Sequence, residues 1–379
     1  MAQTGSGKRP KLFVGRSDRL IARIKAMMYA WRFMEQVDGQ LFMLWTRLPR
    51  RYDDESVGYT PSNIFDLVKW YKNGGAERLC FIDQADRYPE DAIPLDSDEF
   101  KGALRHGFDR DRFAGSDDVF VRRGTGWYFF SDEPVSANYI RRGVRKLFRE
   151  LPIHPHLVSA LERFYDRYDL EPGKYGAIHF RRGDVYEMLR NELPNDANGD
   201  LTDARIELII RHFIVRTAPP EFYHAHVEDM ISRGQKIVFT SDSPETITLF
   251  QKVFGPAHFV DLSQHKLPMV IRKAFLDFLV LTNASEIIGT ASNFTQFASQ
   301  VGQGKSTSVA GTGDFDIAAR EFRDSILSSK DISKSTHEKA LKLLEVDYTA
   351  YAKRVEERER EASHQFDKLI ARGGKIFDT

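Results

Sequence analysis

Short apolar runs and longer amphipathic stretches follow one another along most of the chain, a pattern typical of strands that alternate with helices. The first apolar run, residues 11–15, precedes a stretch whose apolar positions recur with a helical period from Leu20 to Met34. A second run follows at residues 40–45, directly after Gly39. Together these elements predict a strand–helix–strand unit at the start of the chain.

From residue 176 onward the alternation is regular. Strands are predicted at residues 176–180, 236–240, 258–261, 286–289 and 306–310. Helices are predicted between them at residues 203–216, 221–232, 244–254, 269–282 and 293–301. Alternation of this kind predicts a parallel, doubly wound sheet, and therefore an α/β fold.

The segment between these regions, residues 47–150, has a weaker pattern. Strands are predicted near residues 79–82 and 127–130, and helices near residues 62–72, 135–150 and 156–169. Pro152 and Pro155 separate the last two helices and indicate a domain boundary. We therefore expect an N-terminal α/β domain over residues 1–150 and a Rossmann-like domain over residues 151–330.

The last part of the chain, residues 331–379, has the pattern of a long amphipathic helix. Ser335 and Glu338 have the spacing of a capping box at its start, and apolar residues recur along one face from Leu341 to Val355. A surface helix that packs this face on the core is the ordinary interpretation. A helix that joins two copies of the chain in a homodimer is the alternative.

Composition narrows the possible functions. The 379 residues include 55 Lys and Arg and 55 Asp and Glu, so the formal net charge is zero. Binding of nucleic acid through bulk charge needs a basic surplus, and is not expected. Cys80 is the only cysteine, which excludes intramolecular disulfides and cysteine-rich zinc sites. No stretch approaches the ~20 apolar residues of a transmembrane segment, and we expect a cytoplasmic protein.

Three polar clusters directly follow predicted strands. They are residues 179–184 (His-Phe-Arg-Arg-Gly-Asp), 240–245 (Thr-Ser-Asp-Ser-Pro-Glu) and 289–295 (Gly-Thr-Ala-Ser-Asn-Phe-Thr). Ligands of doubly wound sheets bind beyond the C-terminal ends of the strands. The three clusters therefore predict one binding site at this edge of the second sheet.

The first cluster contains two adjacent arginines, Arg181 and Arg182. A guanidinium presents a rigid fork of donors that suits a phosphate or a carboxylate. Because neighbouring residues of a strand point to opposite faces, one arginine can face the ligand while the other braces the loop. The structural alternative is a loop clamp in which an arginine pairs with Asp184.

The other two clusters also allow two interpretations. Backbone N–H groups and hydroxyls at the start of the helix after residue 289 favour an anion. Ordinary N-capping by Ser292 or Asn293 is the alternative there. Ser243 precedes Pro244 and can likewise be a helix N-cap.

Two patterns imitate other sites. The triplets at residues 96–98 and 109–111 (Asp-x-Asp) can hold divalent metals, but they lie in irregular acidic sequence and are interpreted as surface loops. Residues 299–306 end in Gly-Lys-Ser, as a phosphate-binding P-loop does. A P-loop follows a strand and precedes a helix, and here the predicted order is reversed. No metal site is expected, since no His, Asp and Glu set has convincing ligand spacing.

Residues 177–184 resemble the His-x-Arg-Arg-x-Asp signature of the fucosyltransferase superfamily that makes α1,2-, α1,6- and O-linked fucosides. Residues 240–245 are similar to the second motif of that family and residues 277–294 to the third. The opening, residues 14–20, is similar to its Gly-x-Gly-Asn loop, although Ser17 and Asp18 stand where the family has Gly-Asn. Bacterial members that fucosylate chitooligosaccharides also carry a Trp-Arg-Phe like residues 31–33.

This resemblance implies a GT-B fold, in which two Rossmann-like domains face a cleft with the C-terminal helix packed across them. It implies that His179 and Arg181 contact the β-phosphate and fucose end of GDP-fucose, and that Asp277 accepts hydrogen bonds from guanine. It also implies that the pyrophosphate is held at the start of the following helix. The implied GDP-sugar site comprises His179, Arg181, Arg182, Asp242, Asp277, Thr290, Ser292, Asn293 and Phe294.

The implied activity is transfer of L-fucose from GDP-fucose to a glycan, with inversion and without a metal or other cofactor. Use of another GDP-sugar, or binding of a sugar nucleotide without catalysis, are the alternatives. Three residues are candidates for direct roles in the reaction, namely Arg181, Asp184 and Glu187. Both carboxylates are expected on a loop after the strand, and the nearness of Asp184 to the arginines would make it a poor base. We therefore expect Glu187 to accept the acceptor's proton.

Overall fold

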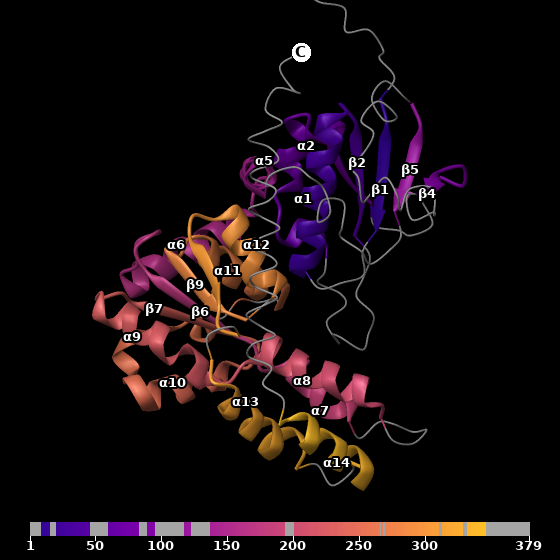
Figure 1. Ribbon diagram of the computed structural model, residues 1–379. Helices are drawn as coiled ribbons and strands as arrows, with labels where there is room; N and C mark the ends of the chain where they lie inside the picture. Colours follow the sequence, from indigo (N-terminus) through magenta and orange to yellow (C-terminus); the bar gives the residue numbers. More distant parts are fainter. Residues whose placement is uncertain are drawn as a thin grey trace, which may run out of the picture. The chain divides into compact units, whose positions relative to one another are not determined.

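A computed structural model describes two compact units of the chain (Figure 1). The described residues are 9–15, 20–45, 60–82, 89–94, 117–122, 137–193, 201–265, 267, 270–290, 292–310, 313–328 and 332–345. The first unit uses the described residues up to Glu162 together with those of Leu267–Leu276, and the second uses those of Arg163–Lys266 and those from Asp277 onward. The chain passes from one unit to the other within helix α6 (Pro155–Tyr168).

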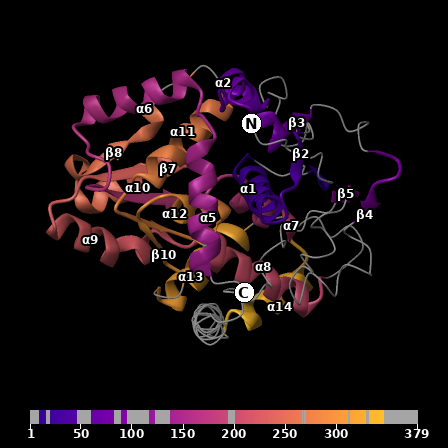
Figure 2. The same cartoon turned by 90° about the horizontal axis from the view of Figure 1, so that it is seen from above.

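The first unit contains a parallel sheet with strand order β3-β2-β1-β5-β4. Its strands are β1 (Lys11–Gly15), β2 (Gln40–Leu44), β3 (Leu79–Ile82), β4 (Ile93–Pro94) and β5 (Val119–Arg122). Its helices include α1 (Leu20–Gln36), α2 (Leu67–Lys72) and α5 (Ala137–Glu150). Helix α1 packs against α5, and Figure 2 shows the two side by side. The strand–helix–strand unit predicted at the start of the chain is confirmed.

One arginine joins the helices of the first unit. Arg78 donates to Glu150 of α5 at 2.7 Å and to Glu35 of α1, and its guanidinium lies 5.0 Å from the ring centroid of Trp31. Trp31 is 1% exposed and meets Trp70 edge-on. Residues 31–33, which resemble a family motif, therefore contribute to the core of this unit.

The second unit contains a parallel sheet with strand order β10-β9-β6-β7-β8. Its strands are β6 (Gly176–Phe180), β7 (Ile237–Ser241), β8 (Phe259–Asp261), β9 (Glu286–Gly289) and β10 (Lys305–Ser308). Its helices are α7 (Asp184–Glu192), α8 (Asp203–Thr217), α9 (His224–Ser232), α10 (Ile247–Phe254), α12 (Asn293–Val301), α13 (Phe315–Glu321) and α14 (Lys334–Leu343). Helix α11 (Val270–Thr282) is divided between the units and belongs to the second from Asp277 onward. The predicted α/β class, with two Rossmann-like parallel sheets, is confirmed.

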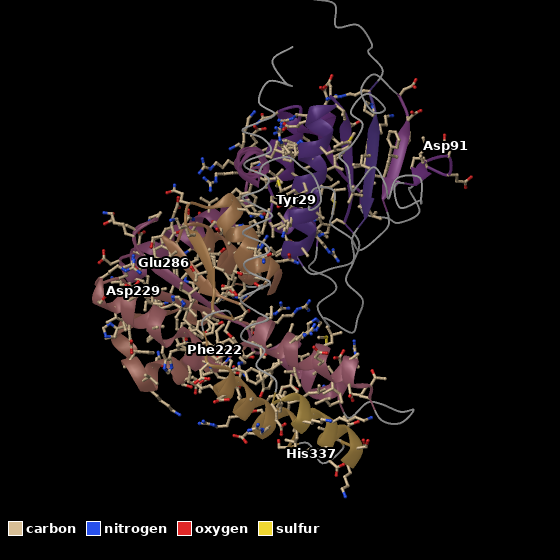
Figure 3. All side chains as sticks on the ribbon, in the orientation of Figure 1. Tyr29, Asp91, Phe222, Asp229, Glu286 and His337 are labelled. Carbon is tan, nitrogen blue, oxygen red and sulfur yellow. The ribbon has the colours of Figure 1, made fainter. Side chains whose placement is uncertain are left out.

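The order of strands in the second sheet locates its crevice. The chain builds β6, β7 and β8 toward one edge, then returns to place β9 on the other side of β6. The connection thus changes direction between β6 and β9, and ligands of doubly wound sheets bind at such a switch point. At the N-terminal ends of the strands, Arg233 forms ion pairs with Asp229 and Glu286, which are labelled in Figure 3.

The structure corrects several predicted elements. Asp184 and Glu187 lie in the first turn of α7 and not on a loop. The N-cap of α14 is Ser333, whose side chain accepts from the N–H of Thr336, so Ser335 is not the cap. Strands β4 and β5, helix α13 and the π-helical turn at Phe322–Ile326 were not predicted.

Other predictions fall where the structure gives no description. The strand at residues 127–130, both Asp-x-Asp triplets, Ser17 and Asp18, and the C-terminal helix beyond residue 345 lie outside the described residues. The P-loop-like segment does follow a helix, α12, and lead into a strand, β10, as expected. In the described part of the chain, no helix is long and apolar enough to cross a membrane.

Candidate functional site

The three polar clusters meet at the C-terminal edge of the second sheet. In the register of the strands, His179 of β6 lies opposite Thr240 of β7 on one side and Gly289 of β9 on the other. The residues that follow these three strands therefore share one edge, at the switch point between β6 and β9. Their convergence, predicted from the sequence, is confirmed.

His179 is held in place by its neighbours on both sides. Its ring is 8% exposed and stacks on Phe294 of α12, with the centroids 4.9 Å apart and the planes at 13°. Its Nδ1 lies 3.1 Å from the hydroxyl of Thr240, and this hydroxyl donates to the carbonyl of Ile178 at 3.0 Å. Because the only proton of Thr240 is used for that carbonyl, Nδ1–H donates to Thr240.

Aromatic rings continue the contact from His179 into the helices. Phe294, in the first turn of α12, meets Phe278 of α11 edge-on at 5.8 Å, and Phe278 stacks on Phe297 at 5.6 Å. Asp277, the expected guanine ligand, precedes Phe278 on α11 and is half-buried. The start of α12 and the middle of α11 are thus fixed relative to His179.

The hydroxyls after β9 have partners within the protein. Ser292 is the N-cap of α12 and accepts from the N–H of Thr295 at 3.2 Å. Thr295 donates to the carbonyl of Thr290 at 3.1 Å, and Thr290 donates to the carbonyl of Arg216 at 2.9 Å. The alternative of ordinary N-capping therefore describes Ser292. Asn293 is the first residue of α12, so its N–H is among those at the helix start.

Arg182 braces the loop after β6. Its two terminal nitrogens engage the two carboxylate oxygens of Glu321 on α13, and one of them also donates to the carbonyl of Ala218 at 3.1 Å. The side chain of Arg182 is 9% exposed. The structure thus contains an arginine clamp, with Glu321 as the observed partner of Arg182. The side chain of Asp184 lies outside the described residues.

Arg181 and Arg182 directly follow β6 and differ in their surroundings. The guanidinium of Arg182 packs over the ring of Phe180, 5.2 Å from its centroid. Arg181 is partly exposed. Because the side chain of Arg182 is engaged by Glu321, Arg181 is the candidate of the two for binding a ligand.

Asp242 supports the same loop from β7. Its Oδ1 accepts from the backbone N–H of Arg182 at 2.9 Å and of Gly183 at 2.8 Å. A Cβ on Gly183 would lie 2.7 Å from Cγ of Asp242, so the close approach requires glycine. This geometry favours a structural role for Asp242, while its expected role in binding the donor stays a prediction.

Glu187 faces a different space. It is exposed and lines a pocket of about 590 Å³ in the second unit, together with Arg182, Tyr186, Glu221, Glu245 and Glu321. The lining is rich in carboxylates, so the pocket does not suit a phosphate. The structure therefore places Glu187 in the pocket that Arg182 also lines.

Sequence reasoning did not identify Glu321, Thr240 as the partner of His179, or the requirement for glycine at position 183. Glu321 follows Arg182 by 139 positions and lies in a segment without a predicted element. No local pattern could have identified this pair. The position of Thr240 at the end of a predicted strand next to β6 was the available signal for the His179 contact.

No family model matches the sequence, and no curated protein matches it. Solved structures of fucosyltransferases are among those similar to the chain. The fucosyltransferase NodZ from Bradyrhizobium is 11% identical, with 77% of this chain and 92% of that chain covered and a TM-score of 0.48. A NodZ α-1,6-fucosyltransferase crystallised with GDP is 13% identical, with 78% and 93% covered and a TM-score of 0.48. POFUT1 in complex with GDP-fucose is 11% identical, with 81% and 99% covered and a TM-score of 0.46.

Proposed function

We propose that the chain is a glycosyltransferase that moves L-fucose from GDP-fucose to a glycan. The observation that carries the proposal is the convergence of His179, Arg181 and the start of α12 at the switch point between β6 and β9. Nucleotides bind at such points of parallel sheets. The choice of GDP and fucose rests on the resemblance of residues 177–184 and 277–294 to the motifs of the fucosyltransferase superfamily.

The chemistry of the site suits departure of a nucleoside diphosphate. Breaking the bond between fucose and phosphate leaves negative charge on GDP, and fixed donors aimed at that charge stabilise the transition state. Arg181 supplies a charged fork of donors, and the first N–H groups of α12 supply further donors with the favourable end of the helix dipole. We propose that this charge is stabilised without a metal ion.

The buried residues define how the donor is held. His179, fixed by Thr240 and Phe294, is proposed to contact the fucose end of the donor. Asp277 is proposed to accept from two neighbouring guanine N–H groups. Because the hydroxyl of Ser292 caps α12, we propose that the pyrophosphate is held mainly by backbone N–H groups from Asn293 onward.

Arg182, Asp242 and Thr290 are proposed to act on the donor mainly through the backbone that they hold. Their polar atoms bind Glu321, the loop after β6 and the carbonyl of Arg216. The acceptor hydroxyl would attack the anomeric carbon with inversion. Glu187, which is exposed, is proposed as the residue that takes the proton of this hydroxyl.

Calorimetry and a transfer screen test the proposal together. We expect GDP and GDP-fucose to bind the full chain, UDP to bind far more weakly, and fucose to be transferred to at least one glycan of an array. Tighter binding and faster transfer of another GDP-sugar would replace fucose as the donor. Binding without turnover on any glycan would indicate a non-catalytic sugar-nucleotide-binding protein. Absence of GDP binding would contradict the proposal as a whole.

A further inference from the structure

We propose that Glu321 is a positioning residue for the donor site. It fixes Arg182 and, through Arg182, the loop between β6 and α7 from which Arg181 projects. The inference rests on the proposed function, since positioning matters only if Arg181 acts on a donor. Glu321 lies on α13, which is remote in sequence from the motifs at the strand ends.

The clamp between Arg182 and Glu321 is bidentate. The two carboxylate oxygens of Glu321 accept hydrogen bonds from the two terminal nitrogens of Arg182. The carbonyl of Ala218, the C-cap of α8, accepts a further hydrogen bond from Arg182. A bidentate pair of this kind fixes orientation as well as distance. The guanidinium of Arg182 is thereby attached to α13 and to the end of α8.

Three aromatic rings lie around the guanidinium of Arg182. Its carbon lies 5.0 Å from the ring centroid of Tyr186, 5.2 Å from that of Phe180 and 5.8 Å from that of Phe213. These rings shield the charge from water, since the side chain is 9% exposed. A shielded guanidinium without its carboxylate would turn toward solvent and move the loop that carries it.

The backbone of the same loop is held by hydrogen bonds to Asp242. Asp242 of the β7 end accepts from the N–H groups of Arg182 and Gly183. The side chain and the backbone of Arg182 are thus held by different elements, α13 and β7. Arg181, the preceding residue, lies between the last residue of β6 and this doubly anchored position. Its direction therefore depends on Glu321.

The end of α13 holds Glu321 in place. It is the last residue of α13, and the π-helical turn Phe322–Ile326 follows at once. Phe322 is fully buried and meets Phe213 edge-on at 5.3 Å. Such turns are uncommon and occur often at functional sites. The buried ring and the π turn place the carboxylate of Glu321 opposite the fork of Arg182.

Two variants of Glu321 and one matched control test the inference. Glu321→Gln keeps the size and removes the charge, and Glu321→Asp keeps the charge on a shorter side chain. Glu228→Gln removes an exposed carboxylate on α9, outside the three clusters. Hydrogen exchange of the amides of residues 181–183 is measured in each protein, with the amides of β6 as the internal reference.

In Glu321→Gln we expect at least tenfold faster exchange of the loop amides with unchanged exchange in β6. We also expect a fall in kcat approaching ~10²-fold, the size of effect that a displacement of about 1 Å can cause. The KM for the glycan should stay unchanged, Glu321→Asp should recover part of both effects, and Glu228→Gln should resemble wild type. Unchanged loop exchange in Glu321→Gln, or faster exchange with normal donor kinetics, would overturn the inference. If wild type binds no GDP, the proposed function fails, while loop exchange still decides whether Glu321 holds the loop.

Discussion

Gly183 and Asp242 approach each other more closely than any other residue type at position 183 would allow. The carboxylate of Asp242 accepts from the N–H of Gly183 at 2.8 Å, and a Cβ on Gly183 would lie 2.7 Å from its Cγ. The loop with both arginines is therefore joined to the end of β7 through backbone atoms. The loop takes its shape from β7 as much as from its own sequence.

The first prediction concerns this junction. Gly183→Ala should displace the carboxylate and weaken both hydrogen bonds, which lowers the free energy of unfolding by about 1–3 kcal/mol. Asp242→Ala should cost a similar amount, and the double variant should cost clearly less than the sum, because both changes remove the same contacts. Urea unfolding of the four proteins measures the coupling. Strictly additive costs would show that Gly183 and Asp242 act independently and would contradict the junction.

The second prediction separates the two arginines. Arg181→Ala should leave the thermal midpoint nearly unchanged while transfer loses about 2.7–4 kcal/mol of transition-state stabilisation. Arg181→Lys should recover little, because lysine lacks the planar fork. Arg163→Ala, on an exposed position of α6, is the matched control. Near-normal turnover of the lysine variant would contradict the role given to Arg181.

The third prediction concerns Arg182. Its removal leaves the carboxylate of Glu321 without its bidentate partner in a half-buried place. Arg182→Ala should therefore lower the free energy of unfolding by about 3–5 kcal/mol, in contrast to Arg181→Ala. Denaturant titration of both single variants provides the comparison. An Arg182→Ala protein as stable as wild type would mean that the clamp does not stabilise this unit.

The comparison of sequence and structure shows where local patterns suffice. β1, β6 and β9 have the predicted bounds because each is a short apolar run with clear flanking residues. Helix α7 was not predicted, because its N-cap, Gly183, has no side chain that could cap the helix. The sequence therefore showed no capping signal where the helix begins.

The candidate site divides in the same way. The strand-end positions of His179 and Arg181 follow from the order of the strands, which alternation predicts. The partner of Arg182 does not, since Glu321 is joined to it only by tertiary packing. A choice between a ligand-binding and a bracing arginine thus needed the fold, because both residues have the same chemistry in the sequence.

The fourth prediction concerns metal removal. Arg181 and the N–H groups of α12 are proposed to carry the charge that leaves with GDP. EDTA should therefore leave transfer essentially intact, measured with GDP-fucose and a glycan identified in the array screen. Activity that disappears with chelator and returns with Mn²⁺ would contradict this mechanism. It would direct attention to the Asp-x-Asp triplets at residues 96–98 and 109–111.

The last prediction concerns the proton of the acceptor hydroxyl. A base in the transition state is worth roughly 10²–10⁴-fold in rate, and Glu187 is an exposed carboxylate in the first turn of α7. Glu187→Gln should therefore lower kcat by at least roughly 10²-fold and leave the Kd for GDP unchanged. Glu221→Gln, from the same pocket, is the control.

Glu187 lines the same pocket as Arg182, so the acceptor hydroxyl would have to reach that pocket for Glu187 to take its proton. Equal turnover of Glu187→Gln and wild type would assign the proton to Asp184, to a residue of 47–150, or to no base.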